Sequence, residues 1–293
     1  MDNLLNQVYK IWGFKKVELI KAIRSGISKK IYLIETNEGK FILMGFGPTY
    51  SEESFLRYIS VLEYLENKPV KLAPKILMDK EGNSYAKIDN KFICIMEYID
   101  GRTLGEELED EYRLGETIAL LHSFDDFQIE SDIRINDTIE EAYKKFYECP
   151  YKSKLYKIID VLPNFYDYRQ GFIHTDIAPH NAIINKNNKV ILIDFDGAGK
   201  GSIYIDAGFP LITQFVRFHG PGDLRFNYEN AKAFYSGYSS ITKLETKDKQ
   251  LIYAGAVFWQ LAHMPSYQPG TENNMLDILK FAIANRDELI SVL

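Results

Sequence analysis

The feature that most constrains the fold is the segment Gly171–Asp206, in which polar residues follow two short apolar runs. Asp176 comes shortly after the first apolar run, and Asn181 follows five residues later. Asp194 ends the second run, which covers residues 190–193. Each run predicts a short strand. The two strands and the loop between them would bring three oxygen ligands together, which suits a magnesium and phosphate site.

These residue types match the needs of phosphoryl transfer, which requires a positioned hydroxyl, a carboxylate that accepts its proton and metal ions that bridge the phosphates. We interpret Asp176 as the base, and Asn181 and Asp194 as oxygen ligands for Mg²⁺. In the alternative, Asp176 caps a turn and Asp194 merely ends a strand. The presence of all these side chains at this spacing favours the catalytic interpretation.

Composition excludes several classes of protein. A chain of 293 residues with 46% hydrophobic and 26% charged residues is typical of a globular protein and favours two lobes. The formal charge of −6 argues against nucleic acid as a partner. No apolar run approaches the roughly 20 residues that span a bilayer, and the first residues lack the apolar core of a secretion signal. We therefore expect a cytoplasmic protein with no membrane partner.

Acidic residues are concentrated between Gly101 and Glu148, with fourteen Asp and Glu against five Arg and Lys. Solvated helix faces explain most such runs. The other explanation is an acidic wall that concentrates a cationic acceptor near the site. Trp259 and Tyr267 offer rings for cation–π contact with such an acceptor, although core packing is the simpler interpretation.

The chain begins with sheet signals and ends with helical ones. The predicted elements are a helix over 1–21, strands over 31–35 and 40–46, a helix from Ser51, strands over 85–88 and 92–96, and mainly helices after Thr103. His122 falls on an apolar helix face, where a hydrogen-bonded histidine is expected more often than a ligand. The order predicts an α+β chain with a sheet-rich lobe over 1–98, a hinge over 99–102 and a larger helical lobe over 103–293.

The motif His174-Thr175-Asp176, followed by Asn181 and then Ile193-Asp194-Phe195, resembles the aminoglycoside phosphotransferase and choline kinase-like family. In that family the pattern reads His-x-Asp-x-x-x-x-Asn and Ile-Asp-aromatic. Recognisable segments extend from about Arg24 to Asp206. The resemblance implies a two-lobed protein kinase-like fold, Mg²⁺, a nucleoside triphosphate that is ATP or GTP, and a small aminoglycoside-like or choline-like acceptor phosphorylated on a hydroxyl.

The same resemblance implies a role for individual residues. Asp176 would be the catalytic base, with Asn181 and Asp194 as the magnesium ligands. The remaining positions are implied to bind the nucleotide: Ser25, Gly26 and Ser28 in the loop over the triphosphate, Met44 on the strand beneath it, and Glu97 and Ile99 in the link that meets adenine.

The sequence departs from the family at Met44, which aligns with a lysine that normally holds the phosphates. A thioether carries no positive charge. Another lysine, such as Lys29, Lys30 or Lys40, could reach the phosphates, or magnesium alone could neutralise their charge. The third possibility is a kinase-like protein that binds nucleotide without useful transfer and acts as a scaffold or sensor.

Overall fold

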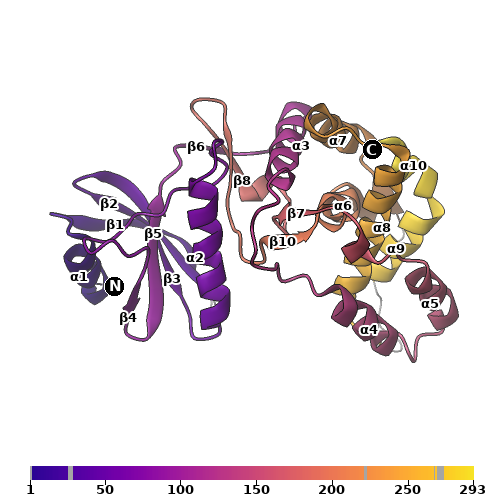
Figure 1. Cartoon of the computed structure of the whole chain (residues 1–293), viewed down its shortest axis with the longest axis horizontal. Helices are drawn as coiled ribbons and strands as arrows, with labels where there is room; N and C mark the ends of the chain where they lie inside the picture. The colour runs from indigo at the N-terminus through magenta and orange to yellow at the C-terminus, as the bar shows by residue number, and fades with distance from the viewer. Residues whose placement is uncertain (1, 26–28, 221–222, 267, 269–273) are drawn as a thin grey trace. The chain divides into compact units, whose positions relative to one another are not determined.

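The computed structural model describes residues 2–25, 29–220, 223–266, 268 and 274–293. The chain divides into two compact units, of which unit 1 comprises Met1–Arg102 and Ile183–Asp196, and unit 2 comprises Thr103–Ala182 and Gly197–Leu293. Figure 1 shows the sheet-rich character of unit 1 and the helical character of unit 2, which confirms the α+β class. The segment 183–196 belongs to unit 1, whereas the boundaries from sequence place it in the second lobe.

Unit 1 is built on an antiparallel sheet in the order β1–β2–β3–β5–β4. Its helices and strands are α1 (Asp2–Trp12), β1 (Val17–Ser25), β2 (Lys29–Thr36), β3 (Gly39–Phe46), α2 (Glu52–Glu66), β4 (Ala86–Ile88) and β5 (Lys91–Glu97). A smaller sheet has the order β6–β8–β9 and consists of β6 (Gly101–Thr103), β8 (Ala182–Asn185) and β9 (Val190–Leu192).

The two faces of the large sheet are covered by different helices. Val8 and Trp12 of α1 pack against one face. Phe55 and Tyr58 of α2 contact Phe46 on the other face. Because both faces are buried, strands β2 and β3 carry apolar residues at successive positions rather than a strict alternation.

The predicted opening helix is confirmed as α1, but its predicted end near Lys21 is wrong, because α1 ends at Trp12 and β1 begins at Val17. Gly13 has φ +76°, a left-handed conformation that ends helices and that glycine adopts without strain. Leu19 and Ile20 are neighbours in sequence and both exposed, so β1 lacks the alternation that identifies a strand. The hairpin of β2 and β3 and the helix capped by Ser51 are confirmed.

Unit 2 consists mainly of helices. Its elements are α3 (Leu108–His122), α4 (Ile135–Lys145), α5 (Lys152–Asp160), η1 (Phe165–Asp167), β7 (Gln170–Ile173), η2 (Pro179–Asn181), β10 (Gly199–Ser202), α6 (Ile203–Thr213), β11 (Val216–Gly220), β12 (Asp223–Phe226), α7 (Tyr228–Ile241), α8 (Thr246–His263), α9 (Asn274–Ala284) and α10 (Arg286–Ser291). Among the residues described, no helix combines the length and apolarity needed to cross a bilayer.

Helices α3 and α7 approach each other closely through two glycines. A Cβ atom at Gly115 would lie 1.9 Å from the carbonyl oxygen of Phe234, and one at Gly237 would lie 1.9 Å from that of Tyr112. Both distances are far below van der Waals contact, so only glycine allows this packing. The close contact holds His122, at the end of α3, beside Tyr238 of α7.

Candidate active site

The loop after β7 is held in place by a buried carboxylate. Asp206 of α6 has no exposed surface, and its oxygens accept hydrogen bonds from the backbone N–H of His174 at 2.7 Å and of Thr175 at 2.8 Å. Thr175 has φ +75°, which is unfavourable for a β-branched residue. Strain of this kind persists only where the surroundings over-determine it, as Asp206 does here. The loop that leads into Asp176 is therefore rigidly positioned.

His122 supports the same carboxylate from α3. Its Nε2 lies 3.0 Å from Asp206 Oδ2, and its Nδ1 lies 2.9 Å from the hydroxyl of Tyr238. The ring is completely buried. The expectation of a hydrogen-bonded histidine on an apolar face is thus confirmed. His122 positions Asp206, and Asp206 in turn positions the loop.

Asp176 and Asn181 lie together within this loop. Asn181 Nδ2 donates to Asp176 Oδ2 at 2.7 Å and to the Asp176 backbone oxygen at 3.0 Å. His174 Nδ1 accepts from the Asp176 N–H at 3.3 Å, so this histidine supports the loop. Because the nitrogen of the Asn181 amide faces Asp176, its oxygen is the atom that can bind a cation.

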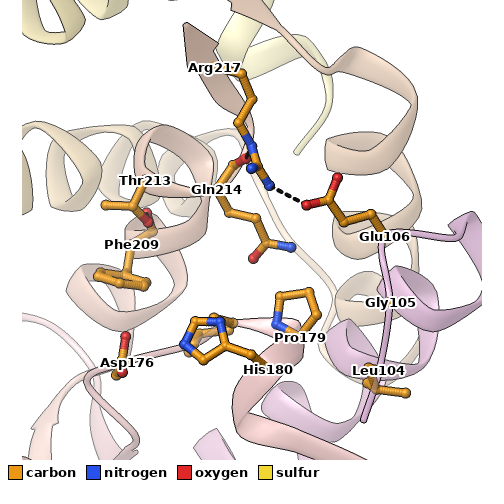
Figure 2. Close-up of a pocket in the computed structure, with 12 residues that line it drawn as sticks. Leu104, Gly105, Glu106, Asp176, Pro179, His180, Phe209, Thr213, Gln214 and Arg217 are labelled. Atoms are coloured by element: carbon orange, nitrogen blue, oxygen red, sulfur yellow. Dashed lines mark hydrogen bonds and ion pairs between the residues drawn. The ribbon is translucent and has the colours of Figure 1, made fainter. Parts of the chain in front are cut away.

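Asp176 lines a cavity of about 480 Å³ within unit 2, which we call the Asp176 cavity. Figure 2 shows Asp176 at one end of this cavity and an ion pair between Glu106 and Arg217 at the other. The Arg217 Nη2 to Glu106 Oε1 distance is 2.8 Å, and both side chains are largely exposed. The cavity is therefore lined by the Asp176 carboxylate and, away from it, by one group of each charge.

Gln214 lies between these two ends in Figure 2 and has an unusual hydrogen-bond state. Its Nε2 donates to both oxygens of Glu111, at 2.7 and 2.8 Å. Its Oε1 is buried and has no hydrogen-bond partner within the described part of the chain. An unsatisfied buried acceptor is costly, so a donor group on a bound molecule would be favourable here. Burial raises the pKa of Glu111 to about 7, although the hydrogen bonds from Gln214 act in the opposite direction.

A second cavity, of about 440 Å³, is lined by Thr175, the neighbour of Asp176. Its wall includes Asp137 and Glu141 from the acidic region and Trp259 of α8. Trp259 is buried and packs edge-on against Phe209, so core packing accounts for most of its ring. Tyr267, the other aromatic residue expected near a cationic acceptor, lies outside the described residues.

Asp194 lies in unit 1, where it is paired with a buried lysine. Lys29 Nζ of β2 is 2.7 Å from Asp194 Oδ1, and the Lys29 side chain is only 3% exposed. The same ammonium also pairs with Asp196. Asp194, a predicted magnesium ligand, itself has φ +65°, in the left-handed region that few non-glycine residues adopt. Asp194 and Asp176 follow strands of different sheets, since β9 pairs with β8 and β7 pairs with β10.

Asp196 links Lys29 to helix α2. The hydroxyl of Tyr50 donates to Asp196 Oδ1 at 3.1 Å, and Arg57 Nη2 donates to the Asp196 backbone oxygen at 3.0 Å. Burial raises the pKa of the Asp196 carboxyl above its ordinary value, and Lys29 opposes that rise. Glu52, the first residue of α2, is exposed. The anions around Lys29 thus follow β9 and do not come from α2.

Asn181 and Asp194 each offer an oxygen donor of the kind that magnesium prefers. Mg²⁺ is usually held by one or two carboxylates or similar oxygens together with substrate phosphates and water. No group of three or more His, Cys, Asp or Glu side chains that could hold a metal occurs among the described residues. That one ion is held by both residues stays a prediction. Asn181 belongs to unit 2 and Asp194 to unit 1.

The remaining predicted nucleotide-binding residues are placed as follows. Gly26 and Ser28 lie outside the described residues, and of Ser25 only the backbone, at the end of β1, is described. Met44 is 3% exposed in the core of unit 1. The Glu97 N–H donates to the Lys75 carbonyl at 2.8 Å, and Ile99 is buried. Their contacts with nucleotide stay predictions.

Sequence reasoning missed Gln214 and Arg217 altogether, because they are far from the motif and belong to no recognisable pattern. It also did not decide which of three lysines, Lys29, Lys30 or Lys40, lies near the phosphates. Which of the neighbours Lys29 and Lys30 is buried depends on the register of β2 against β3, and sequence spacing alone does not give that register.

Comparison with known proteins identifies relatives over most of the chain. Residues 19–240 match the family model described as "APH: Phosphotransferase enzyme family". A homoserine kinase from Beijerinckia indica is 22% identical over 248 residues, which cover 78% of this chain and 74% of that protein.

Two solved structures show the same fold. An aminoglycoside phosphotransferase from Alicyclobacillus acidocaldarius superposes with a TM-score of 0.65 at 12% identity, over 97% of this chain and 93% of that one. A microcompartment-associated aminopropanol kinase gives a TM-score of 0.60 at 17% identity, over 99% and 96% of the two chains. The kinase-like fold expected from the motif is confirmed.

Proposed function

The chain belongs to the phosphotransferase enzyme family, and from this premise we propose that it transfers the γ-phosphoryl group of ATP to the hydroxyl of a small acceptor that carries an amine. Family membership makes the chain a kinase with a hydroxyl acceptor. The proposal adds the identities of the nucleotide, the metal and the acceptor. The observation that carries the proposal is the Asp176 carboxylate, held by Asn181 at 2.7 Å on the wall of the Asp176 cavity.

In the proposed reaction the acceptor oxygen forms a bond to the γ-phosphorus while the bond from that phosphorus to the β–γ bridging oxygen breaks. ADP leaves, and the hydroxyl proton passes to the carboxylate of Asp176. Asn181 fixes the orientation of this carboxylate, and Asp206 fixes the backbone that carries it. Mg²⁺ bound by Asn181 and Asp194 would neutralise charge on the phosphates.

The Asp176 cavity supports an amine-bearing acceptor, because Gln214 Oε1 is a buried acceptor without a partner among the described residues and Glu106 is a carboxylate. Both atoms can accept hydrogen bonds from an ammonium group. Arg217, the ion-pair partner of Glu106, has further guanidinium donors with which to bind a carboxylate. This set of groups fits a hydroxy amino acid, and the named relatives include kinases of homoserine and aminopropanol. We therefore propose homoserine as the first acceptor to test.

The expectation of a scaffold or sensor rested on Met44, which offers no positive charge. A buried lysine beside Asp194 removes that reason, because unit 1 does hold a cation near the predicted magnesium ligand. Family membership likewise favours transfer.

The experiment is an ADP-release assay with Mg-ATP over homoserine, ethanolamine, aminopropanol, choline and an aminoglycoside. Glu106→Gln should raise the KM for the amine acceptor about tenfold with little change in kcat, because it removes a charged hydrogen-bond acceptor from the cavity. Asp137→Asn, in the second cavity, is the matched control and should leave both constants unchanged.

The reverse pattern, with Asp137→Asn impaired and Glu106→Gln normal, would move the acceptor to the second cavity. Turnover with none of the amines would contradict the proposed acceptor class.

A further inference from the structure

We infer that Lys29, on strand β2, binds the phosphate groups of the nucleotide in place of the lysine expected at Met44 on β3. The inference rests on the proposed function and specifies how unit 1 carries it out. It assigns the phosphate-binding cation to a different strand from the one that the family resemblance indicates.

The position of Met44 is closed to a charged group. Met44 is 3% exposed, and the Tyr58 hydroxyl lies 3.5 Å from its sulfur and 3.6 Å from the sulfur of Met96. Burial raises the pKa of Tyr58 well above its ordinary value, so the hydroxyl stays protonated and acts as a donor. Helix α2 thus fills this part of the sheet with a neutral aromatic residue.

Lys29 lies diagonally across from Met44, on the neighbouring strand β2. In the antiparallel register, Lys29 faces Phe46 and Ile31 faces Met44, and residues directly opposite each other share one face of the sheet. The Lys29 side chain therefore lies on the same face as Met44, two residues further along the strand. Its Nζ is 5.1 Å from the centre of the Tyr58 ring and 5.9 Å from that of Phe46.

The ammonium of Lys29 lies beside Asp194, the predicted metal ligand. A buried charge is costly unless it is paired. Lys29 is paired with Asp194 at 2.7 Å and with Asp196, and its ammonium also lies over the two rings. If a magnesium ion on Asp194 holds the phosphates of the nucleotide, those phosphates would need a second positive charge near Asp194, and Lys29 supplies one there.

Other basic residues do not share this placement. Lys30 and Lys40, the alternatives from sequence, are exposed. Arg24 Nη1 is 3.5 Å from Asp194 Oδ2, but its side chain is 59% exposed and so more easily screened by solvent. Lys29 is the buried partner of Asp194 among these residues.

The test compares Lys29→Met with Lys30→Met, an exposed lysine on the same strand, as the matched control. ATP affinity with Mg²⁺ should fall about 10- to 100-fold in Lys29→Met, as expected for the loss of charged hydrogen bonds, and should be unchanged in Lys30→Met. Adenosine, which lacks phosphates, should bind both variants as it binds the unaltered chain. Equal losses for ATP and adenosine would mean a purely structural role and would overturn the inference, as would no loss of ATP affinity.

A second measurement uses the unaltered chain, in case Lys29→Met does not fold. An ATP derivative acylated on its γ-phosphate transfers the acyl group to a lysine amine beside the phosphates, where an amide bond forms and ATP leaves. Mass spectrometry should find the acyl group on Lys29, and an excess of ATP should prevent the reaction. Modification of Lys30 or Lys40 instead, or of no lysine, would overturn the inference.

The failure of this inference can be told apart from failure of the proposed function. An unaltered chain that neither binds nor turns over ATP contradicts the function itself. A chain that transfers phosphate normally after Lys29→Met contradicts only the role of Lys29.

Discussion

The two units present their proposed functional groups in different ways. In unit 2, Asp176 and Asn181 come from one short loop, and their 2.7 Å contact follows from five residues of local geometry. In unit 1, Asp194 pairs with Lys29 of β2, and the two residues are 165 positions apart in the sequence. A catalytic base must be held in one orientation, so the spacing between the proposed base Asp176 and its partner Asn181 is recognisable in the sequence. A positive charge needs only a location, and a long side chain on either of two adjacent strands can supply it.

The largest expected effect breaks the site in unit 2 and leaves unit 1 intact. Asp176→Asn should lower kcat about 10²- to 10⁴-fold, because it removes the group that accepts the proton. ATP affinity should stay unchanged, since the residue makes no phosphate contact in the proposed reaction. Kinetics and equilibrium binding of ATP check both parts, with the exposed Asp287→Asn as control. Transfer that survives the substitution would show that Asp176 is not the base.

A smaller effect is expected when a second cation is placed in unit 1. Met44→Lys should lower the free energy of unfolding by about 3 kcal/mol, because it buries an ammonium beside Lys29 in a site filled by Tyr58. Chemical denaturation measures this loss. In the background of Lys29→Met the cost should be about 1–3 kcal/mol smaller, since the repulsion between the two cations is removed. Increased stability of the single variant would mean that the Met44 position has room for a charge.

The smallest effect concerns the support of the Asp176 cavity. The pKa of Glu111 is raised from 4.5 to about 7 in the folded chain, so its contribution to stability is complete below pH 4.5 and is lost as the pH rises through 7. Relative to Glu111→Gln, the unaltered chain should therefore lose about 1–3 kcal/mol of unfolding free energy between pH 5 and pH 8. Denaturation at several pH values tests this difference. Parallel curves for the two chains would mean that Glu111 ionises normally.

The sequence by itself determined the local parts of the molecule. The hairpin of β2 and β3, the cap at Ser51 and the loop with Asp176 and Asn181 follow from turn residues, capping side chains and short spacings, which act within a few residues. The same local signals failed for β1, where exposed apolar neighbours such as Leu19 and Ile20 conceal the alternation of a strand.

Only the tertiary structure decided which lysine is buried and which groups surround the Asp176 cavity. Lys29 and Lys30 are adjacent in sequence, and the register of β2 on β3 turns the first inward and the second outward, since a shift of one residue would exchange their faces. Gln214 reaches Glu111 across 103 residues of sequence. Such contacts depend on how whole elements pack, and no spacing along the chain encodes them.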